Sequence, residues 1–349
     1  MGVRRTAALL LALLAARAVR AQAPPGRPES YREEARVERV VVDAYVTDRR
    51  SEPIPDLTAE DFLVKVDGKR VPLESVEWIP AAMPELASPV GSAGSEGQTL
   101  PVAAPGRLIV FFFQTDYNPS RIVGLLRMSL QAKRFLDGLL PTDRVAVVSY
   151  DSHLKLRQDF TSDRRKLEAA LFASIRTAEP ARDYDAYSPS LARNFDFAGA
   201  MKAATPERGL FLVASALAPI PGGKSMLYFG WGLGTVGGLS GPNATEWRDY
   251  GRALRTLAAA RVNIFTLDVT DADYHSLETS LRVTSELTGG TYQKTHIFPS
   301  AALDRVRRAI AGRYVLVFVK PPGKRGEHAI DVVLTRRKGE VNARHYYDD

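Results

Sequence analysis

The short polar segment from Gln114 to Asn118 holds the side chains best placed to bind a ligand. It follows the unbroken apolar run LIVFFF at 108–113, and Asn118 precedes Pro119. Such a run is typical of a strand buried on both faces of a parallel sheet, and Asn before Pro is typical of a helix N-cap and first helical residue. Ligands of doubly wound sheets bind at the carboxyl ends of strands. We therefore expect any site to lie around Gln114 to Asn118.

A second group of polar side chains follows a later predicted strand, at 262–268. Asp268, Asp271 and Asp273 lie at or just after the end of that strand, and the carboxyl ends of parallel strands share one edge of a sheet. Carboxylate oxygens are ligands that Mg²⁺ and Mn²⁺ prefer, so these residues and Asp116 could bind a cation together. The alternative is that they cap the following helix and solvate its loop.

A glycine-rich loop gives the sharpest enzyme hypothesis. Gly232 to Gly237 reads G-x-G-x-x-G directly after a predicted strand, and the next strand ends in Asp268, where a ribose-binding acid would lie. However, residues 238–242 intervene before the next helix, so no helix N-terminus would face a pyrophosphate. Asp268 also lies well beyond the roughly 20 residues that the motif requires. A surface loop is the better interpretation, with a nucleotide-binding enzyme as the alternative.

Other catalytic patterns are missing from the sequence. The five histidines form neither H-E-x-x-H nor an i,i+4 pair, which argues against zinc. There is no G-x-S-x-G elbow, and nothing points to a Ser/His/Asp triad. The chain has no cysteine, which excludes disulfides, thiolate metal sites and a lipid-modified cysteine. We therefore expect a protein that is not an enzyme.

The N-terminus predicts export. Residues 1–23 combine a basic start, an apolar stretch from Ala7 to Ala16 and a small-x-small cleavage site at Ala21-Gln22-Ala23, as in a secretory signal peptide. A membrane anchor needs about 20 apolar residues, and Arg17 and Arg20 interrupt this run. We expect a periplasmic or extracellular protein with no stable membrane insertion after cleavage.

Most of the net charge of +7 lies in the predicted signal peptide. Four arginines lie within it, at positions 4, 5, 17 and 20, so that +7 minus these four gives +3. No Lys/Arg run is interleaved with aromatic residues, as a nucleic-acid binder would require. The expected partner is another protein or a surface polymer, and not a nucleic acid.

β segments are predicted at both ends of the remaining sequence. Residues 24–35 are a lead rich in Pro and charge, and 80–106 are a flexible linker rich in Pro, Gly, Ser and Ala. The predicted strands are 37–47, 62–66 and 71–78 in an N-terminal unit at 36–79, and 314–319, 328–334 and 341–347 in 313–349. The turn Asp67-Gly68 predicts a type I′ hairpin. Either set alone would be marginal, so we expect both to pair into one β-sheet or sandwich.

Residues 107–312 alternate strands and helices, which predicts a Rossmann-like, doubly wound α/β sheet. The predicted strands are 108–113, 144–150, 154–160, 224–229, 262–268 and 291–294, with 154–160 as an antiparallel edge. Helices are predicted at 122–140, 163–175, 205–219, 243–260 and 300–311, and one more runs from Asp273 or Ser276 to Gly289-Gly290. The caps that support them are Asp163, Thr205-Pro206 and a capping box from Asn243 to Glu246.

Several stretches stand out when taken in order: VVDAYVTDRRSEPIPDLTAEDFLVKV at 41–66, DRVAVV at 143–148, DFTSD at 159–163, PGGKS at 221–225, LTGG at 287–290, and the tail from Arg313-Tyr314 to Tyr347. In this order they resemble exported bacterial proteins with a von Willebrand factor type A-related domain, a family common in acidobacteria. The resemblance covers about 36–349.

That resemblance implies a Rossmann-like domain whose top face holds a divalent cation and a protein ligand. The cation site needs Asp-x-Ser-x-Ser after the first strand, a Thr from a second loop and an Asp after the fourth strand. The matching positions here are Gln114, Asp116 and Asn118, followed by Gly230 or Trp231, and no Thr is clearly placed. One carboxylate replaces two, so Asp116 and Asn118 would bind Mg²⁺ or Mn²⁺ only weakly. Their alternative role is to cap the first helix.

These observations predict an exported, non-enzymatic interaction or adhesion module with a degenerate metal site. Its ligand-binding rim would comprise Gln114, Asp116, Tyr117, Asn118, Trp231, Asp268 and Asp271. Binding without metal, through Tyr117 and Trp231, is one version of this hypothesis. The alternatives are an enzyme with an unrecognised site and a structural protein of the cell envelope.

Overall fold

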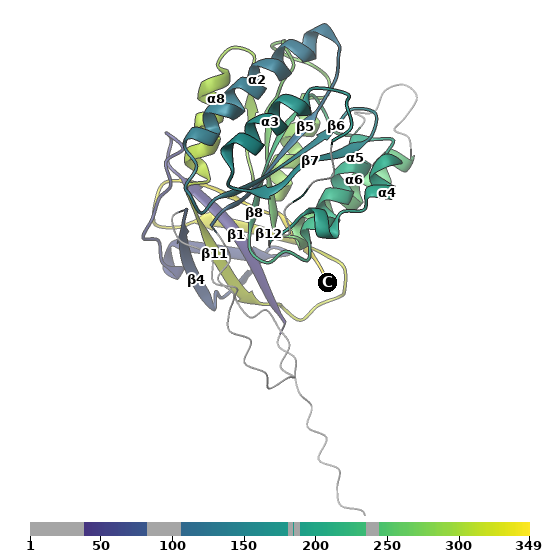
Figure 1. Ribbon diagram of the computed structural model, residues 1–349. Coiled ribbons are helices and arrows are strands. Elements are labelled where there is room, and N and C mark those ends of the chain that lie inside the picture. The colour runs from purple at the N-terminus through teal and green to yellow at the C-terminus, as the bar shows by residue number, and fades with distance from the viewer. Residues whose placement is uncertain (1–37, 82–105, 181–183, 185–188, 235–243) are drawn as a thin grey trace, which may run out of the picture. The chain divides into compact units, whose positions relative to one another are not determined.

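The computed structural model describes residues 38–81, 106–180, 184, 189–234 and 244–349 (Figure 1). The predicted signal peptide at 1–23, the lead at 24–35 and most of the predicted linker at 80–106 lie outside these residues. So do residues 235–243, which include the end of the glycine motif and the Asn243 cap.

A six-stranded sheet forms the centre of residues 106–312, in the order β10-β9-β8-β5-β6-β7. Its strands are β5 (Leu108–Gln114), β6 (Arg144–Tyr150), β7 (Leu154–Thr161), β8 (Lys224–Gly230), β9 (Val262–Asp268) and β10 (Tyr292–Lys294). All neighbours are parallel except β6 and β7, which are antiparallel. All seven residues of β5 are buried between β8 and β6. The prediction of a buried central strand with an antiparallel edge strand nearby is confirmed.

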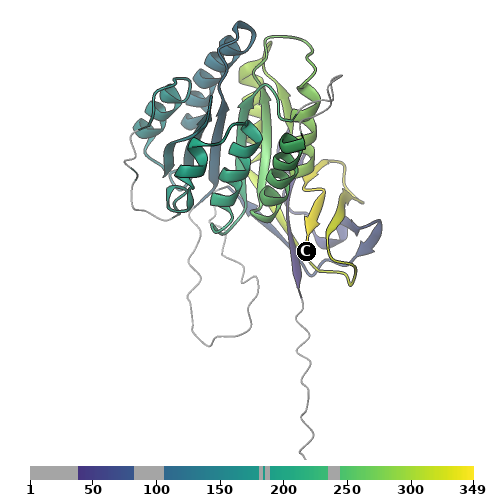
Figure 2. The same cartoon turned by 90° about the vertical axis from the view of Figure 1, so that its right-hand side faces the viewer.

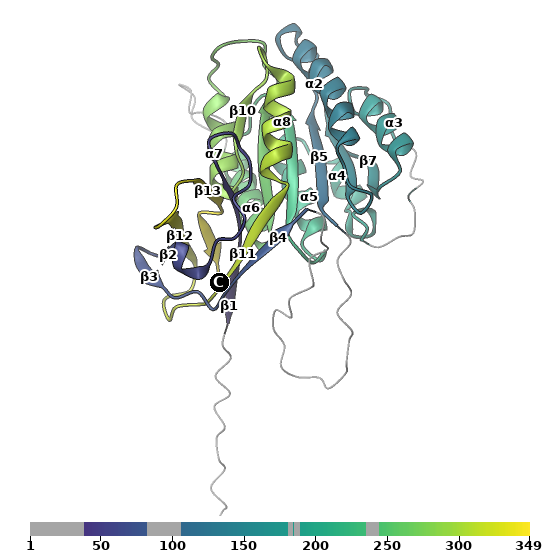
Figure 3. The same ribbon diagram turned by 90° about the vertical axis from the view of Figure 1, so that its left-hand side faces the viewer.

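Helices cover both faces of this sheet, as the predicted doubly wound fold requires (Figures 1 and 3). They are α2 (Pro119–Asp137), α3 (Arg164–Ser174), α4 (Phe197–Met201), α5 (Pro206–Leu217), α6 (Ala244–Ala259), α7 (Glu278–Thr288) and α8 (Pro299–Ala309), with a 3₁₀ turn at Ala192–Asn194. Side chains alternate across a strand. Ile109, Phe111 and Phe113 therefore pack with α2, α3 and α8, whereas Val110 and Phe112 pack with α5, α6 and α7.

Most helices begin where their caps predict. The side chain of Asn118 accepts from the backbone N–H of Ser120 with Pro119 in the first turn, and Asp163 and Thr205 cap α3 and α5. The predicted start of α7 at Asp273 or Ser276 is wrong, because α7 begins at Glu278 without a side-chain cap. Asp273 instead accepts a hydrogen bond from His296. Gly289, at φ 81°, ends α7 in the left-handed conformation as predicted.

Two four-stranded antiparallel sheets form from the two ends of the described chain (Figure 2). One has the order β13-β1-β11-β4 and the other β14-β12-β2-β3. Their strands are β1 (Arg39–Thr47), β2 (Phe62–Val66), β3 (Lys69–Val71), β4 (Ser75–Pro80), β11 (Gly312–Val319), β12 (Glu327–Leu334), β13 (Glu340–Ala343) and β14 (Tyr346–Asp348), with a 3₁₀ turn at Ala59–Asp61. β1 pairs with β11, and β2 with β12, so the predicted pairing of the two ends is confirmed.

Two of the predicted strands are each divided between these sheets. The single strand predicted at 71–78 is wrong, because β3 pairs with β2 and β4 pairs with β11 in the other sheet. The strand predicted at 341–347 is likewise wrong: β13 pairs with β1, and β14 with β12. Each of these two stretches therefore leaves one sheet and enters the other, as strands at the corners of packed sheets do. The hairpin turn itself is as predicted, with φ of 49° at Asp67 and 77° at Gly68.

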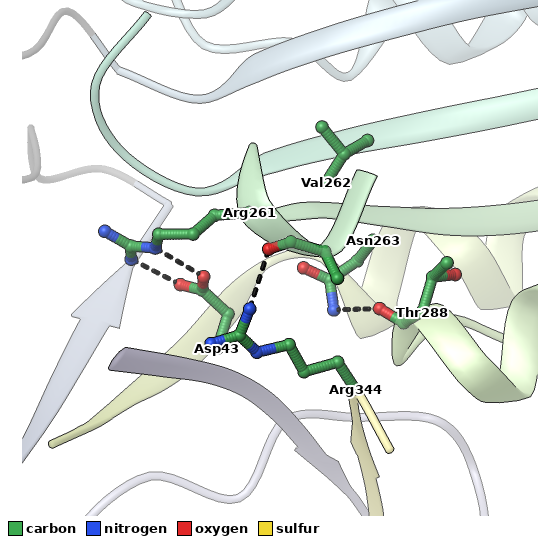
Figure 4. Close-up of a pocket in the computed structure, with 7 residues that line it drawn as sticks. Asp43, Arg261, Val262, Asn263, Thr288 and Arg344 are labelled. Carbon is green, nitrogen blue, oxygen red and sulfur yellow. Dashed lines mark hydrogen bonds and ion pairs between the residues drawn. The ribbon is translucent and has the colours of Figure 1, made fainter. Parts of the chain in front are cut away.

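A buried carboxylate ties β1 to the six-stranded sheet (Figure 4). Arg261, just before β9, donates to both oxygens of Asp43 at 2.8 and 2.7 Å, and Arg313 in β11 donates to one of them at 3.0 Å. Beside them Arg344 donates to the carbonyls of Ala258 and Val41, at 2.7 and 2.9 Å. One carboxylate thus holds residues from β1, β9 and β11 together.

Within the described residues, no helix has the length and apolarity needed to cross a membrane.

Candidate functional site

The candidate site lies at the carboxyl edge of the six-stranded sheet, where the loops after β5, β8, β9 and β10 meet. The loop after β5 is fixed by Thr115, whose N–H donates to the carbonyl of Tyr150 at 2.7 Å. The hydroxyl of Thr115 donates to the carbonyl of Ser174 at 3.1 Å. The loop is thus anchored to β6 and to the end of α3 before it enters α2.

Gln114 joins the loop after β5 to the loop after β8. Its side-chain oxygen accepts from the N–H groups of Trp231 and Gly232, at 3.0 and 3.3 Å. A Cβ at Gly230 would lie 2.6 Å from the same oxygen, so this approach requires glycine there. The side chain of Gln114 is only 1% exposed. The predicted rim residue Gln114 therefore lies beneath the surface and connects two loops.

Asp116 and Asn118, the predicted metal ligands, both make internal bonds. One oxygen of Asp116 accepts from the N–H of Asn118 at 2.9 Å, and the other forms an ion pair with Arg121. The side-chain oxygen of Asn118 accepts from the N–H and the hydroxyl of Ser120, at 3.1 and 2.8 Å. Asn118 therefore caps α2, which was the alternative to its predicted role as a metal ligand, and Asp116 stabilises the turn before this helix.

Two aromatic side chains, Tyr117 within this turn and Trp231 after β8, make contacts at the same edge. Tyr117 is 54% exposed, and its hydroxyl donates to the carbonyl of Ile175 at 3.2 Å. Burial, and then the carboxylate of Asp151, raise the pKa of the Tyr117 hydroxyl, so it remains a donor at neutral pH. The guanidinium of Arg121 lies 3.8 Å from the ring centroid of Trp231, a cation–π contact.

The carboxylate of Asp268 faces into the protein. It is 3% exposed, and one oxygen contacts Nε2 of His275 at 2.7 Å and the hydroxyl of Tyr292 at 2.9 Å. The other oxygen accepts from the N–H of Thr270 at 3.0 Å. Burial, and then the charge of Asp268, raise the pKa of Tyr292. Asp268 is thus an internal anchor for the loop after β9.

The other acids of this loop lie apart from one another. Asp271 donates its N–H to the carbonyl of Ser120 at 2.7 Å, and its carboxylate lies 3.9 Å from Arg127. Asp273 contacts Nε2 of His296 at 2.9 Å. Within the described ranges, no group of three or more His, Cys, Asp or Glu side chains could hold a metal ion.

The described part of the glycine-rich loop is held by the protein itself. The N–H of Gly234 donates to the buried carboxylate of Glu207 at 2.5 Å, and a Cβ at Gly232 would lie 2.6 Å from that of Leu277. The acid that a ribose would need, Asp268, is engaged with His275 and Tyr292. The close approach of Leu277 explains the glycine at 232, and the left-handed φ of 69° explains the glycine at 234, both without a nucleotide.

Exposed apolar side chains gather at the same edge, and the sequence did not single them out. Tyr274 follows β9, whereas Ile297 and Phe298 follow β10; these three are 74%, 60% and 69% exposed. Arg127 in α2 donates to the carbonyl of His296 at 2.8 Å, which fixes the loop after β10 beside α2. We define the rim as Tyr117, Tyr274, Ile297 and Phe298. It spans three loops of one sheet edge.

Sequence comparisons give no relative: no known family profile and no curated protein matches this chain. Three structural likenesses are with a von Willebrand factor type A protein from Catenulispora acidiphila, protein BatB from Bacteroides thetaiotaomicron, and three N-terminal domains of the type V pili tip protein Mfa5 from Porphyromonas gingivalis. Their identities are 11%, 12% and 11%, and their TM-scores 0.40, 0.39 and 0.40. The matches cover 85%, 59% and 90% of this chain, and 74%, 98% and 68% of the others. Likenesses with these TM-scores and identities do not assign a function to this chain.

Proposed function

We propose that this chain is a non-enzymatic interaction module that binds another protein or a surface polymer through its rim, without a metal ion. The supporting observation is that four large, exposed apolar side chains, Tyr117, Tyr274, Ile297 and Phe298, lie on three loops of one sheet edge. Large exposed apolar side chains are typical of interaction surfaces, and aromatic side chains are enriched there.

The donor set at this edge favours binding without metal. The oxygens of Gln114, Asp116 and Asn118 already accept hydrogen bonds from the loops they hold. Asp116 is also neutralised by Arg121. Mg²⁺ requires near-ideal octahedral oxygen coordination, usually with one or two carboxylates. These residues therefore fit a divalent cation poorly. They share only their position in the fold with the ligands of a metal-dependent adhesion site.

Rigid support beneath the rim favours recognition of a large partner. The rim loops are held by Thr115, Gln114 and Asp268, each bonded to a neighbouring strand or loop. A pre-formed surface loses little conformational entropy on binding. Export, which we infer from residues 1–23, would place the partner in the periplasm or outside the cell. Membership of the acidobacterial family stays a prediction.

Site-specific photo-crosslinking tests this function. Tyr117 and Phe298 would each be replaced by p-benzoylphenylalanine, and the purified protein irradiated with envelope extract in magnesium or in EDTA. The matched control is the same replacement at Val319, which is 41% exposed but lies at the end of β11. We expect one and the same adduct from positions 117 and 298, unaffected by EDTA and missing at 319. Loss of the adduct in EDTA, or equal labelling at 319, would contradict the proposal.

A further inference from the structure

A basic groove lies on the β part of the molecule, on elements that the rim does not use. It has a volume of about 850 Å³ and lies between the turn after β1, the end of β12 and the start of β13. Its lining comes from residues 48–50, 332–334 and 337–341. Figure 3 labels β12 and β13, the two strands beside it.

Four cations surround this groove, and all are exposed: Arg49, Arg50, Arg337 and Lys338. Neighbouring cations have partners, since Arg336 pairs with Glu60 and Arg308 with Glu52. None of the four forms an ion pair with a carboxylate in the described part of the chain. The carboxylate of Asp48 is used locally, because it accepts from the N–H groups of Arg50 and Glu52 at 2.8 and 2.9 Å. Asp48 and Glu340 are the two carboxylates of this lining, so four cations minus two carboxylates leave the groove with a net charge of +2.

The cations gather at the start of β13, and the other end of this strand packs against the end of α7. β13 is the outermost strand of its sheet, and Glu340 at its start pairs with Thr47, the last residue of β1. The turn that holds Arg49 and Arg50 and the turn that holds Arg337 and Lys338 therefore flank the same end of β13. Beside it, β14 pairs only with residues 327–329 of β12. An outermost strand offers backbone groups on which another strand can pair.

We propose that the free edge of β13 binds an extended, acidic segment of a partner protein by strand addition. Strand addition uses main-chain hydrogen bonds for affinity and side chains for specificity. Here the four cations would attract carboxylates at one end of the segment, and Leu334 and Val341 would contact its apolar residues. A flat anionic bilayer fits less well, because membrane-binding surfaces insert large apolar side chains. The groove's only large exposed apolar residue is Val333, among the residues described.

Fluorescence anisotropy with a labelled peptide, EEEETVTV, tests this surface on the full chain. The double variant Arg337→Glu/Lys338→Glu reverses two groove charges. Its control, Lys69→Glu/Arg70→Glu, reverses two exposed charges on β3 in the other sheet. We expect the groove variant to raise the Kd about tenfold or more at low salt, and the control to change it by less than about twofold. A peptide N-methylated on alternate amides, which cannot pair as a strand, should also bind about tenfold more weakly.

Three outcomes would overturn the proposal. The wild-type chain does not bind EEEETVTV, both charge variants raise the Kd equally, or N-methylation of either alternate set of amides leaves the Kd unchanged. Binding of phosphatidylglycerol vesicles with the same sensitivity to Arg337→Glu/Lys338→Glu would point to a membrane instead. If that variant does not fold, as judged by circular dichroism, Arg49→Glu/Arg50→Glu provides the same test from the opposite turn.

Discussion

Replacing Asp43 by Asn should lower the free energy of unfolding, because it weakens the link between β1, β11 and the six-stranded sheet. Asp43 is 4% exposed and accepts hydrogen bonds from Arg261 and Arg313. Burial raises the pKa of its carboxyl, but the charges and hydrogen bonds of Arg261 and Arg313 outweigh burial and hold the pKa well below its usual range. The folded protein therefore needs the charged form of this side chain.

The cost of the replacement follows from what it leaves behind. Asn has nearly the same shape as Asp, so packing stays intact while the two guanidiniums lose their common counter-charge, with Arg344 close by. Removing one partner of a buried ion pair costs about 3–5 kcal/mol, a large share of the roughly 5–15 kcal/mol that stabilises a typical domain. Urea unfolding followed by circular dichroism would measure the loss.

The control is a similar pair on the surface. Asp304 lies 3.2 Å from Arg307 in α8 with a half-exposed side chain, and an exposed pair of this kind contributes about 0–1 kcal/mol. Asp304→Asn should therefore leave the free energy of unfolding nearly unchanged. A difference below about 1 kcal/mol for Asp43→Asn, measured at pH 7, would refute the role assigned to this carboxylate.

The pH dependence provides an independent check with a definite sign. An unfolded Asp has a pKa of about 3.9, and that of folded Asp43 is lower. Its contribution to stability is thus fully present above about pH 5 and declines as the pH falls through and below about 4. The gap between wild type and Asp43→Asn should stay constant from about pH 7 to 5 and narrow from about pH 4 to 2. A gap that widens on acidification would contradict the assignment.

Three further substitutions test other parts of the fold by thermal unfolding. Gly124→Ala should destabilise the protein by more than about 3 kcal/mol, because its Cβ would lie 1.8 Å from the carbonyl oxygen of Val269; an unchanged Tm would mean that α2 can shift freely. Asn118→Ala should cost about 1 kcal/mol through loss of the cap on α2, while Asn118→Ser should restore most of it. Tyr228→Phe should stabilise by about 1 kcal/mol or more, because no residue that the structure describes bonds to its buried hydroxyl; a loss of stability would show that this hydroxyl does have a partner.

Local patterns were enough to predict most of the α/β region. The apolar run at 108–113 identified β5, and Asn118 with Pro119 identified the start of α2, because both signals depend on adjacent residues. The start of α7 was missed because Asp273, one of its two predicted caps, bonds to His296 on another loop. A carboxylate at a helix start predicts a cap only when no tertiary partner competes for it.

Tertiary contacts decided what the sequence could not predict about the β strands and the site. Residues 71–78 and 341–347 were each predicted as one continuous strand, yet each crosses between two sheets, and a period of two does not mark the crossing. The exposed residues Tyr274, Ile297 and Phe298 gave no periodic signal, and only the sheet topology places their loops at the same edge as the loop that holds Tyr117. Arg121 was missed because its two partners, Asp116 and Trp231, lie on different loops.

The metal question can be settled by calorimetric titration of the purified protein with Mg²⁺ and Mn²⁺. To bind Asp116, a cation would have to displace Arg121 and the N–H of Asn118, and Gln114 offers an amide oxygen that already holds Trp231 and Gly232. One engaged carboxylate makes a weak site, so we expect no saturable binding below about 1 mM for either ion. Arg121→Ala frees the carboxylate but adds no ligand, and should raise the affinity only slightly. Tight binding by the wild type that Asp116→Ala abolishes would show that the ion pair between Asp116 and Arg121 gives way to metal, and that the loop after β5 is a metal site.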